Sequence, residues 1–214
     1  MGKRIQFSVY LFITLCISIN SRAQEAQKEV LFNGTDLSGW ETVKTENIKF
    51  WKVVDGVITG GDGERKIPVN TYLVTKEKYA DFEFRCLFRI SGDHKTGLIN
   101  SGIQYRSQIE HGNIIGYQAD IGKGYWGDIY DEHRRGKLVS GSLEIASKLL
   151  KEEGWNSYII RCEGNRHRLY INGVLTCEYE ETNAAIPAAG VFGLQLHSGG
   201  KAKIEFKHVE ITPL

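Results

Sequence analysis

The chain has few cysteines, and their spacing fits neither a structural zinc site nor a disulfide. Only four occur in 214 residues, and none forms a Cys-x-x-Cys or Cys-x-x-His pair, so the sequence does not support a structural zinc site. Cys162 and Cys177 fall on two expected strands that flank a third. This arrangement places them ~9–10 Å apart, too far for a disulfide. We therefore expect Cys86, Cys162 and Cys177 to be free thiols, buried as small apolar side chains.

No long apolar run occurs outside the N-terminus. Lys3 and Arg4 precede an apolar stretch at residues 5–19, and Ser21-Arg22-Ala23 has the small-x-small pattern of a cleavage site. Residues 1–23 are thus predicted to be a signal peptide, with an uncleaved anchor as the alternative. Cleavage after Ala23 predicts an exported protein, periplasmic or extracellular, with an N-terminal extension at residues 24–29 and a single domain at residues 30–214.

Neither charge dominates the predicted mature chain. Without Lys3, Arg4 and Arg22, 24 of the 27 basic side chains remain against 26 acidic ones, a net charge of −2. There is no basic stripe to bind nucleic acid and no basic amphipathic helix to bind a membrane surface. The balance favours a neutral partner.

Proline is scarce and glycine abundant, with three and 24 residues respectively. The glycines stand mostly between short β-branched or aromatic runs, which is typical of an all-β domain. The clearest unit is residues 156–180, where Asn172-Gly173 predicts a tight hairpin turn. Residues 143–153 are expected to form a short helix or an extended loop. The pattern as a whole predicts a two-sheet antiparallel sandwich with one concave face for a ligand.

Three stretches place polar side chains between apolar ones with a period of two. Since successive side chains of a strand point to opposite faces, the polar set is expected to share one face of a sheet. Carboxamides, an arginine, an aspartate and a histidine on one face suit a hydroxyl-rich ligand such as a small carbohydrate. The set comprises Gln104, Arg106, Gln118, Asp120, Gln195 and His197.

The segment at residues 122–137 follows one of these strands directly and is expected to form a wall of the site. Trp126 and Tyr130 offer flat faces for stacking on a sugar, and Asp128 and Glu132 offer carboxylates for its hydroxyls. The competing interpretation is a loop packed on its own aromatic rings, with its charges in surface ion pairs.

Several residues of this set are candidates for catalysis. Arg106 can stabilise a developing oxyanion, and His197 can exchange a proton near neutral pH. Asp120, Asp128 and Glu132 are the candidates for acid–base work or for binding a divalent metal. The sequence supports no particular metal, because it contains neither His-x-His nor His-Glu-x-x-His.

Five segments together resemble one known family, at residues 31–40, 79–84, 100–106, 116–120 and 155–158, with Asn172-Gly173 beside them. The chain is similar to the 3-keto-disaccharide hydrolase domain family, which implies a concanavalin A-like jelly roll over about residues 30–214. Many members have Glu-x-Gln where this chain has Gln118-Ala119-Asp120.

The resemblance implies cleavage of glycosides whose sugar is oxidised at C3. A 3-keto group acidifies the C2 proton, so that a base can remove it, the C1 substituent can leave and water can add back. Asp120 or His197 would serve as base or acid, and Arg106 or a bound metal as electrophile. The alternative is a lectin-like module that binds carbohydrate without cleaving it, because the same fold serves both purposes.

Overall fold

The computed structural model describes residue 2 and residues 27–214. Apart from Gly2, the predicted signal peptide lies outside the described residues, as do residues 24–26 of the predicted extension. Within the described part, no helix is both long and apolar enough to cross a membrane.

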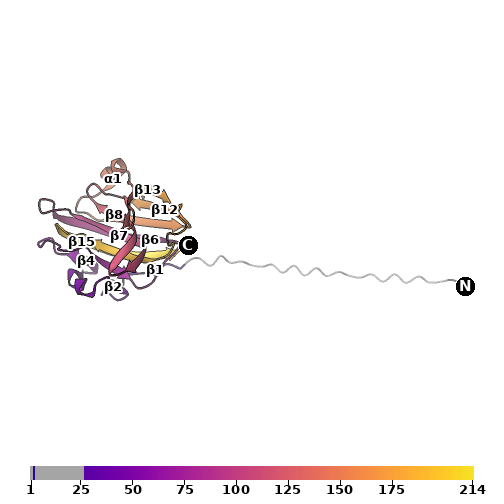
Figure 1. The fold of residues 1–214 in the computed structure, drawn as a ribbon, viewed down its shortest axis with the longest axis horizontal. Helices are drawn as coiled ribbons and strands as arrows, with labels where there is room; N and C mark the ends of the chain where they lie inside the picture. Colours follow the sequence, from indigo (N-terminus) through magenta and orange to yellow (C-terminus); the bar gives the residue numbers. More distant parts are fainter. Residues whose placement is uncertain (1, 3–26) are drawn as a thin grey trace.

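Fifteen strands of the described residues form two sheets (Figure 1), and the two-sheet antiparallel arrangement is the one that the sequence predicts. The first, sheet A, runs in the order β13 (Val174–Glu180), β12 (Arg166–Ile171), β11 (Asn156–Glu163), β6 (Phe82–Asp93), β15 (Lys201–Pro213), β4 (Val57–Gly61) and β3 (Trp51–Val54), with β1 (Glu29–Val30) also paired to β15. The second, sheet B, runs in the order β10 (Gly136–Val139), β9 (Ile129–Glu132), β8 (Asn113–Gly122), β7 (Asn100–Glu110), β14 (Val191–Leu196), β5 (Thr71–Thr75) and β2 (Trp40–Thr42).

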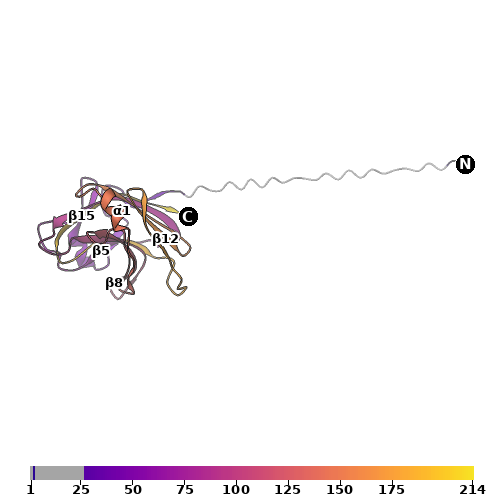
Figure 2. The same cartoon turned by 90° about the horizontal axis from the view of Figure 1, so that it is seen from above.

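Helical structure is confined to two short elements in the described residues. They are the 3₁₀ helix η1 (Thr45–Phe50) and the helix α1 (Leu143–Leu149), which lies beside β13 at one end of the layers (Figures 1 and 2). The sequence left open whether residues 143–153 form a helix or a loop. A helix forms over the first seven of them, where the Ser142 hydroxyl accepts the Ile145 N–H as an N-cap.

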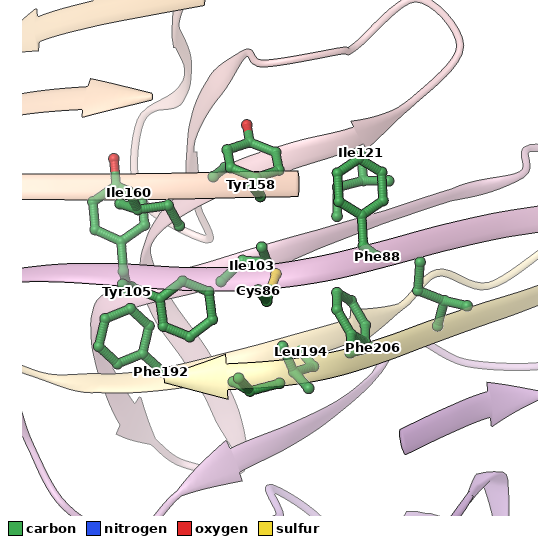
Figure 3. Close-up of a cluster of buried hydrophobic side chains, with 14 of the residues drawn as sticks. Cys86, Phe88, Ile103, Tyr105, Ile121, Tyr158, Ile160, Phe192, Leu194 and Phe206 are labelled. Atoms are coloured by element: carbon green, nitrogen blue, oxygen red, sulfur yellow. The ribbon is translucent and has the colours of Figure 1, made fainter. Parts of the chain in front are cut away.

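One hydrophobic core lies between the sheets. Phe88 and Phe206 of sheet A meet Ile103, Tyr105 and Leu194 of sheet B there, all fully buried (Figure 3). These three residues of sheet B alternate with the polar ones in the sequence. Because they face the core, the polar residues between them are directed to the opposite face wherever the strand is regular.

Two local predictions are confirmed. Asn172 and Gly173 form the turn between β12 and β13, with φ values of 50° and 81° that suit a two-residue hairpin. Cys86, Cys162 and Cys177 are free and buried, with Cys162 on β11 and Cys177 on β13 at either side of β12.

Candidate functional site

The polar face of sheet B gathers most of the predicted carboxamides. In the strand register, Gln104 of β7 lies opposite Gln118 of β8, and Gln118 lies opposite Tyr130 of β9. Directly opposed residues have their side chains on the same face. Asp120 lies two residues along β8 from Gln118, and Gln195 of β14 lies opposite Tyr72 of β5.

A directional chain of hydrogen bonds crosses this face and ends at a carboxyl group. The Ser107 hydroxyl donates to Gln104 Oε1 (2.8 Å), Gln104 Nε2 donates to Gln118 Oε1 (2.8 Å), and Gln118 Nε2 donates to Asp120 Oδ1 (2.5 Å). The Gln118 carboxamide lies over Gly102, where a Cβ would stand 2.5 Å from Gln118 Cδ. Glycine at position 102 is therefore necessary for this arrangement.

Asp120 is the carboxyl group whose protonation the fold changes most clearly. The residue is 3% exposed, and burial raises its pKa to about 8, with the charges of Asp128 and Glu132 contributing and the Gln118 hydrogen bond opposing. At neutral pH its second oxygen therefore carries a proton. Asp120 can act as an acid in a site where an ordinary aspartate could not.

A second polar group lies at the other side of the face, around Tyr72. Gln195 Nε2 donates to the Tyr72 hydroxyl oxygen (3.1 Å), while the buried Gln195 Oε1 has no hydrogen-bond partner among the described residues. Burial raises the pKa of Glu132, and the nearby charges of His133 and His197, with a hydrogen bond from Tyr72, oppose this. Glu132 thus lies within reach of the charges of both histidines and accepts from the tyrosine.

His197 lies directly after β14, in the same neighbourhood. Its Nδ1 is 2.7 Å from the carbonyl oxygen of Ser198. A carbonyl oxygen only accepts hydrogen bonds, so Nδ1 bears the proton, and Nε2 of the neutral ring then has a free lone pair. The face therefore holds a proton donor at Asp120 and a proton acceptor at His197.

The distal end of the β7–β8 hairpin, residues 108–115, covers part of the face; it is called the hairpin below. Ile114 packs in a small apolar cluster with Tyr72, Val74 and Val191 of the neighbouring strands. The hairpin tip reaches Lys44, whose Cε would lie 3.5 Å from a Cβ at Gly112. The hairpin is held by His133, whose Nδ1 donates to the Ile114 carbonyl oxygen (2.8 Å). The hairpin thus packs over the β5 and β14 side of the polar face, where Gln104 and Gln195 are buried.

A cavity of about 290 Å³ opens beside this cover. Tyr72 lines it together with polar groups from the β2–η1 segment, the hairpin tip and the end of β14. Its size approaches the lower end of the range for small-molecule sites. Its lining residues are Val43, Lys44, Asn47, Val69, Asn70, Thr71, Tyr72, Gly112, Asn113, Ile114, His133 and Ser198.

The expected position of Arg106 on the polar face is wrong. A bulge interrupts β7 between Tyr105 and Gln108, and Arg106 adopts a φ of 47° there. The extra residue turns its side chain towards sheet A, where it donates to Asp81 Oδ1, Ala80 O and Gly164 O, each at 2.8 Å. Arg106 therefore ties the two sheets together and cannot serve as electrophile on the polar face.

The predicted wall of the site is only partly present. Trp126 packs against the core, with its ring centroid 6.3 Å from that of Phe88, so its placement as a sugar-stacking wall is wrong. Asp128 is buried and has a structural role: it accepts the Gly141 N–H at 2.9 Å and forms an ion pair with Lys137 at 2.5 Å. Tyr130 and Glu132 do border the polar face. The loop therefore packs one of its aromatic rings on the core of the sandwich and leaves Tyr130 half-buried at the polar face.

Tyr72 and His133 belong to the site but were not predicted. Tyr72 stands in a strand whose five residues are all buried, so no alternation marks its polar face. His133 is in a turn with a φ of 57°, and its role depends on the position of a hairpin 19 residues away. Within the described residues, no group of three or more His, Cys, Asp or Glu side chains is placed to hold a metal ion.

Solved structures with this fold include proteins linked to carbohydrates. A protein of Parabacteroides distasonis ATCC 8503 with a provisional glycosyl hydrolase assignment is 22% identical over 87% of this chain and 94% of its own, with a TM-score of 0.61. The carbohydrate-binding module CBM66 of Bacillus subtilis is 16% identical over 80% and 94%, with a TM-score of 0.58. The VIP36 exoplasmic/lumenal domain, bound to Ca²⁺ and Man3GlcNAc, is 10% identical over 83% and 86%, with a TM-score of 0.58.

These likenesses establish a jelly-roll fold shared with lectins and carbohydrate-binding modules. Among curated proteins, none matches the chain. The family model for the 3-keto-alpha-glucoside-1,2-lyase-like domain matches residues 27–212, which confirms the resemblance seen in the sequence and indicates a carbohydrate-related function. The chain belongs to the 3-keto-alpha-glucoside-1,2-lyase-like domain family.

Proposed function

We propose that this protein cleaves glycosides of 3-keto sugars by elimination at the polar face of sheet B. The observation that carries the proposal is the pairing of opposite proton-transfer groups on one face. Asp120 holds a proton at neutral pH because its pKa is about 8, and His197 presents a free Nε2 lone pair. Elimination needs one group of each kind.

In the first step, His197 Nε2 takes the C2 proton, which the neighbouring C3 carbonyl acidifies. The electron pair of the C2–H bond forms a C1=C2 double bond, and the C1–O bond breaks with its electrons leaving on the oxygen. The negative charge of Glu132, which interacts with that of His197, stabilises the imidazolium that forms. A carboxylate beside a histidine is a common means of supporting such a base.

Asp120 completes the elimination by protonating the departing oxygen. Its proton remains bound up to about pH 8, so the acid form prevails at neutral pH. Water then adds to C1, and C2 regains a proton, which gives the free 3-keto sugar and net hydrolysis. The ionised Asp120 left by the first step can take a proton from this water, which restores the starting state.

The electrophile for the C3 oxygen is assigned to Tyr72 in place of Arg106. Burial raises the pKa of Tyr72, so its hydroxyl keeps its proton. Its oxygen accepts from Gln195 Nε2, and its proton, which bonds Glu132 in the free protein, would turn to the C3 oxygen when the substrate binds. A neutral donor suits an enolate that forms only transiently.

Substrate access requires the β7–β8 hairpin to lift, since it covers the polar face. The contacts to be given up are modest: the Ile114 packing, the His133 hydrogen bond and the approach to Lys44. Once closed again, the hairpin would exclude water during elimination. We further propose that the protein acts after export, which N-terminal sequencing of the native protein would test by finding Gln24 first.

The test is turnover of p-nitrophenyl 3-keto-glucoside, with the unoxidised glucoside as matched control. We expect nitrophenol release from the keto substrate alone. In D₂O, the released 3-keto sugar should carry one deuterium at C2 above the exchange measured with sugar alone. Cleavage of both substrates at similar rates, or no excess deuterium at C2, would contradict elimination.

A non-catalytic carbohydrate-binding module is the second candidate. Gln104 and Gln118 satisfy each other by hydrogen bonds in a buried network, an arrangement that also suits a passive binding surface. Saturable binding of a 3-keto glucoside without turnover would favour the module over the enzyme.

A further inference from the structure

Gln195 holds a buried acceptor atom that the fold itself leaves unused. The residue is 1% exposed, and its Oε1 has no hydrogen-bond partner among the described residues. Buried polar atoms in native proteins are nearly always paired, so a lone one in a candidate site points to a missing ligand group.

The neighbouring groups fix which end of the carboxamide is left free. The Tyr72 hydroxyl has one proton, and its hydrogen bond to Glu132 uses it. The Tyr72 oxygen therefore accepts from Gln195, which must present Nε2 to it, at 3.1 Å. The unpaired end is then the carbonyl, and the group it lacks is a donor such as a hydroxyl.

The strand register sets the distance between this acceptor and Asp120. Gly102 of β7 lies opposite Asp120 of β8, and Leu194 of β14 lies opposite Ile103, so the next position pairs Gln195 with Gly102. Asp120 and Gln195 thus stand in one row across three strands, two strand spacings or ~9–10 Å apart. Gly102 between them has no side chain, and the Gln118 carboxamide lies over it.

We propose that Gln195 Oε1 accepts the C4 hydroxyl of the 3-keto pyranose and makes the enzyme specific for sugars that have it. The inference rests on the proposed function, in which Asp120 protonates the oxygen on C1. C1 and C4 lie at opposite ends of a pyranose ring. A ring stacked on the Gln118 carboxamide above Gly102, with its C1 oxygen at Asp120, directs its C4 hydroxyl to Gln195.

This geometry predicts strong discrimination. A sugar without the C4 hydroxyl leaves Oε1 unpaired after the site has closed, as it is in the free protein, and forfeits the hydrogen bond. Sites built to hydrogen-bond a substrate hydroxyl reject the analogue lacking it much more strongly than apolar pockets reject a missing methylene. We expect the 4-deoxy substrate to lose about 10²–10⁴-fold in kcat/KM.

The experiment compares p-nitrophenyl 3-keto-glucoside with its 4-deoxy and 6-deoxy analogues on the full chain and on Gln195→Leu. The wild type should discriminate against the 4-deoxy analogue alone. Gln195→Leu should lose most activity on the parent substrate but treat the parent and 4-deoxy substrates alike, within about threefold. Gln108→Leu is the matched control, because Gln108 is a β7 carboxamide bonded to the Ala189 carbonyl oxygen outside the site. It should keep wild-type discrimination.

A purely structural role for Gln195 gives a different result. Gln195→Leu would then slow both substrates by the same factor, and the wild-type preference for the C4 hydroxyl would persist, which overturns the proposal. If the variant does not fold, the wild type alone decides: equal kcat/KM for parent and 4-deoxy substrates overturns it. Absence of turnover with every substrate refutes the proposed function. Calorimetry with 3-keto-glucose and its 4-deoxy form then tests the role of Gln195 in binding. Equal affinities for the two sugars would overturn that role.

Discussion

The protonated state of Asp120 can be tested through the stability of the protein. In the unfolded chain an aspartate has a pKa of about 3.8, and in the folded protein burial raises it to about 8. Between these values the folded protein keeps a proton that the unfolded chain has released. Its stability therefore falls as pH rises through this window, and the loss is complete above pH 8.

The size of the effect follows from the shift. Raising the pKa from 3.8 to about 8 costs the folded protein at most about 6 kcal/mol at high pH relative to pH 3, because each pH unit between the two values contributes about 1.4 kcal/mol. Asp120→Asn removes the titrating group and keeps an oxygen to accept the Gln118 N–H. The free energy of unfolding of the variant, relative to that of the wild type, should thus rise by about 1.4 kcal/mol for each pH unit between pH 4 and 8.

Urea unfolding of both proteins at half-unit pH steps measures this difference, since other titrating groups contribute similarly to both curves. The difference should rise by about 4 kcal/mol from pH 5 to 8 and level off above it. Parallel stability curves would refute the raised pKa and, with it, the assignment of Asp120 as an acid. The same pKa predicts that wild-type kcat/KM falls above about pH 8.

Three further predictions concern residues outside the proton-transfer groups. Arg106→Met should lower the free energy of unfolding by about 2–3 kcal/mol, because the charged hydrogen bonds to Asp81, Ala80 and Gly164 are lost. In assays well below its Tm, kcat of the folded variant should stay within about threefold of the wild type. A hundredfold loss of kcat would instead indicate a catalytic role for Arg106. Gly190→Ala should destabilise by at least about 1–3 kcal/mol in urea, because its Cβ would lie 2.3 Å from the Arg106 carbonyl carbon at the bulge; an unchanged midpoint would contradict this packing. Burial raises the pKa of Cys162 and Cys177 to about 12, so iodoacetamide at pH 8 should modify them only after denaturation, as peptide mass spectrometry would show; rapid modification of native protein would contradict it.

The regular parts of sheet B were predictable because strand alternation has a period of two. Ile103, Leu194 and Ala119 face the core, and this alone directs Gln104, Gln195 and Asp120 to the opposite face. The turn at Asn172-Gly173 was predictable for an equally local reason, the positive φ that both positions adopt.

Arg106 could not be placed from alternation, because it lies in a bulge, where the extra residue interrupts the regular alternation of faces along β7. The bulge is fixed by long-range contacts, in which Gly190 approaches the backbone of residues 106 and 107 closely. Trp126 belongs to a loop whose course depends on how it caps the core near Phe88. Neither contact leaves a periodic signal in the sequence.

Tyr72 and His133 were hidden for a different reason. The strand of Tyr72 is buried on both faces because the β7–β8 hairpin folds over it, so its pattern resembles an ordinary core strand. His133 acquires its role only when that hairpin is in place.

The measurement that tests the central claim most directly is a crystal structure of the protein with an uncleavable 3-keto thioglucoside. We predict a pyranose on the polar face of sheet B beneath the β7–β8 hairpin, with the C1 sulfur beside Asp120 and the C2 hydrogen towards His197 Nε2. A sugar bound elsewhere on the chain, or on this face with C1 and C2 turned away from both residues, would contradict the account.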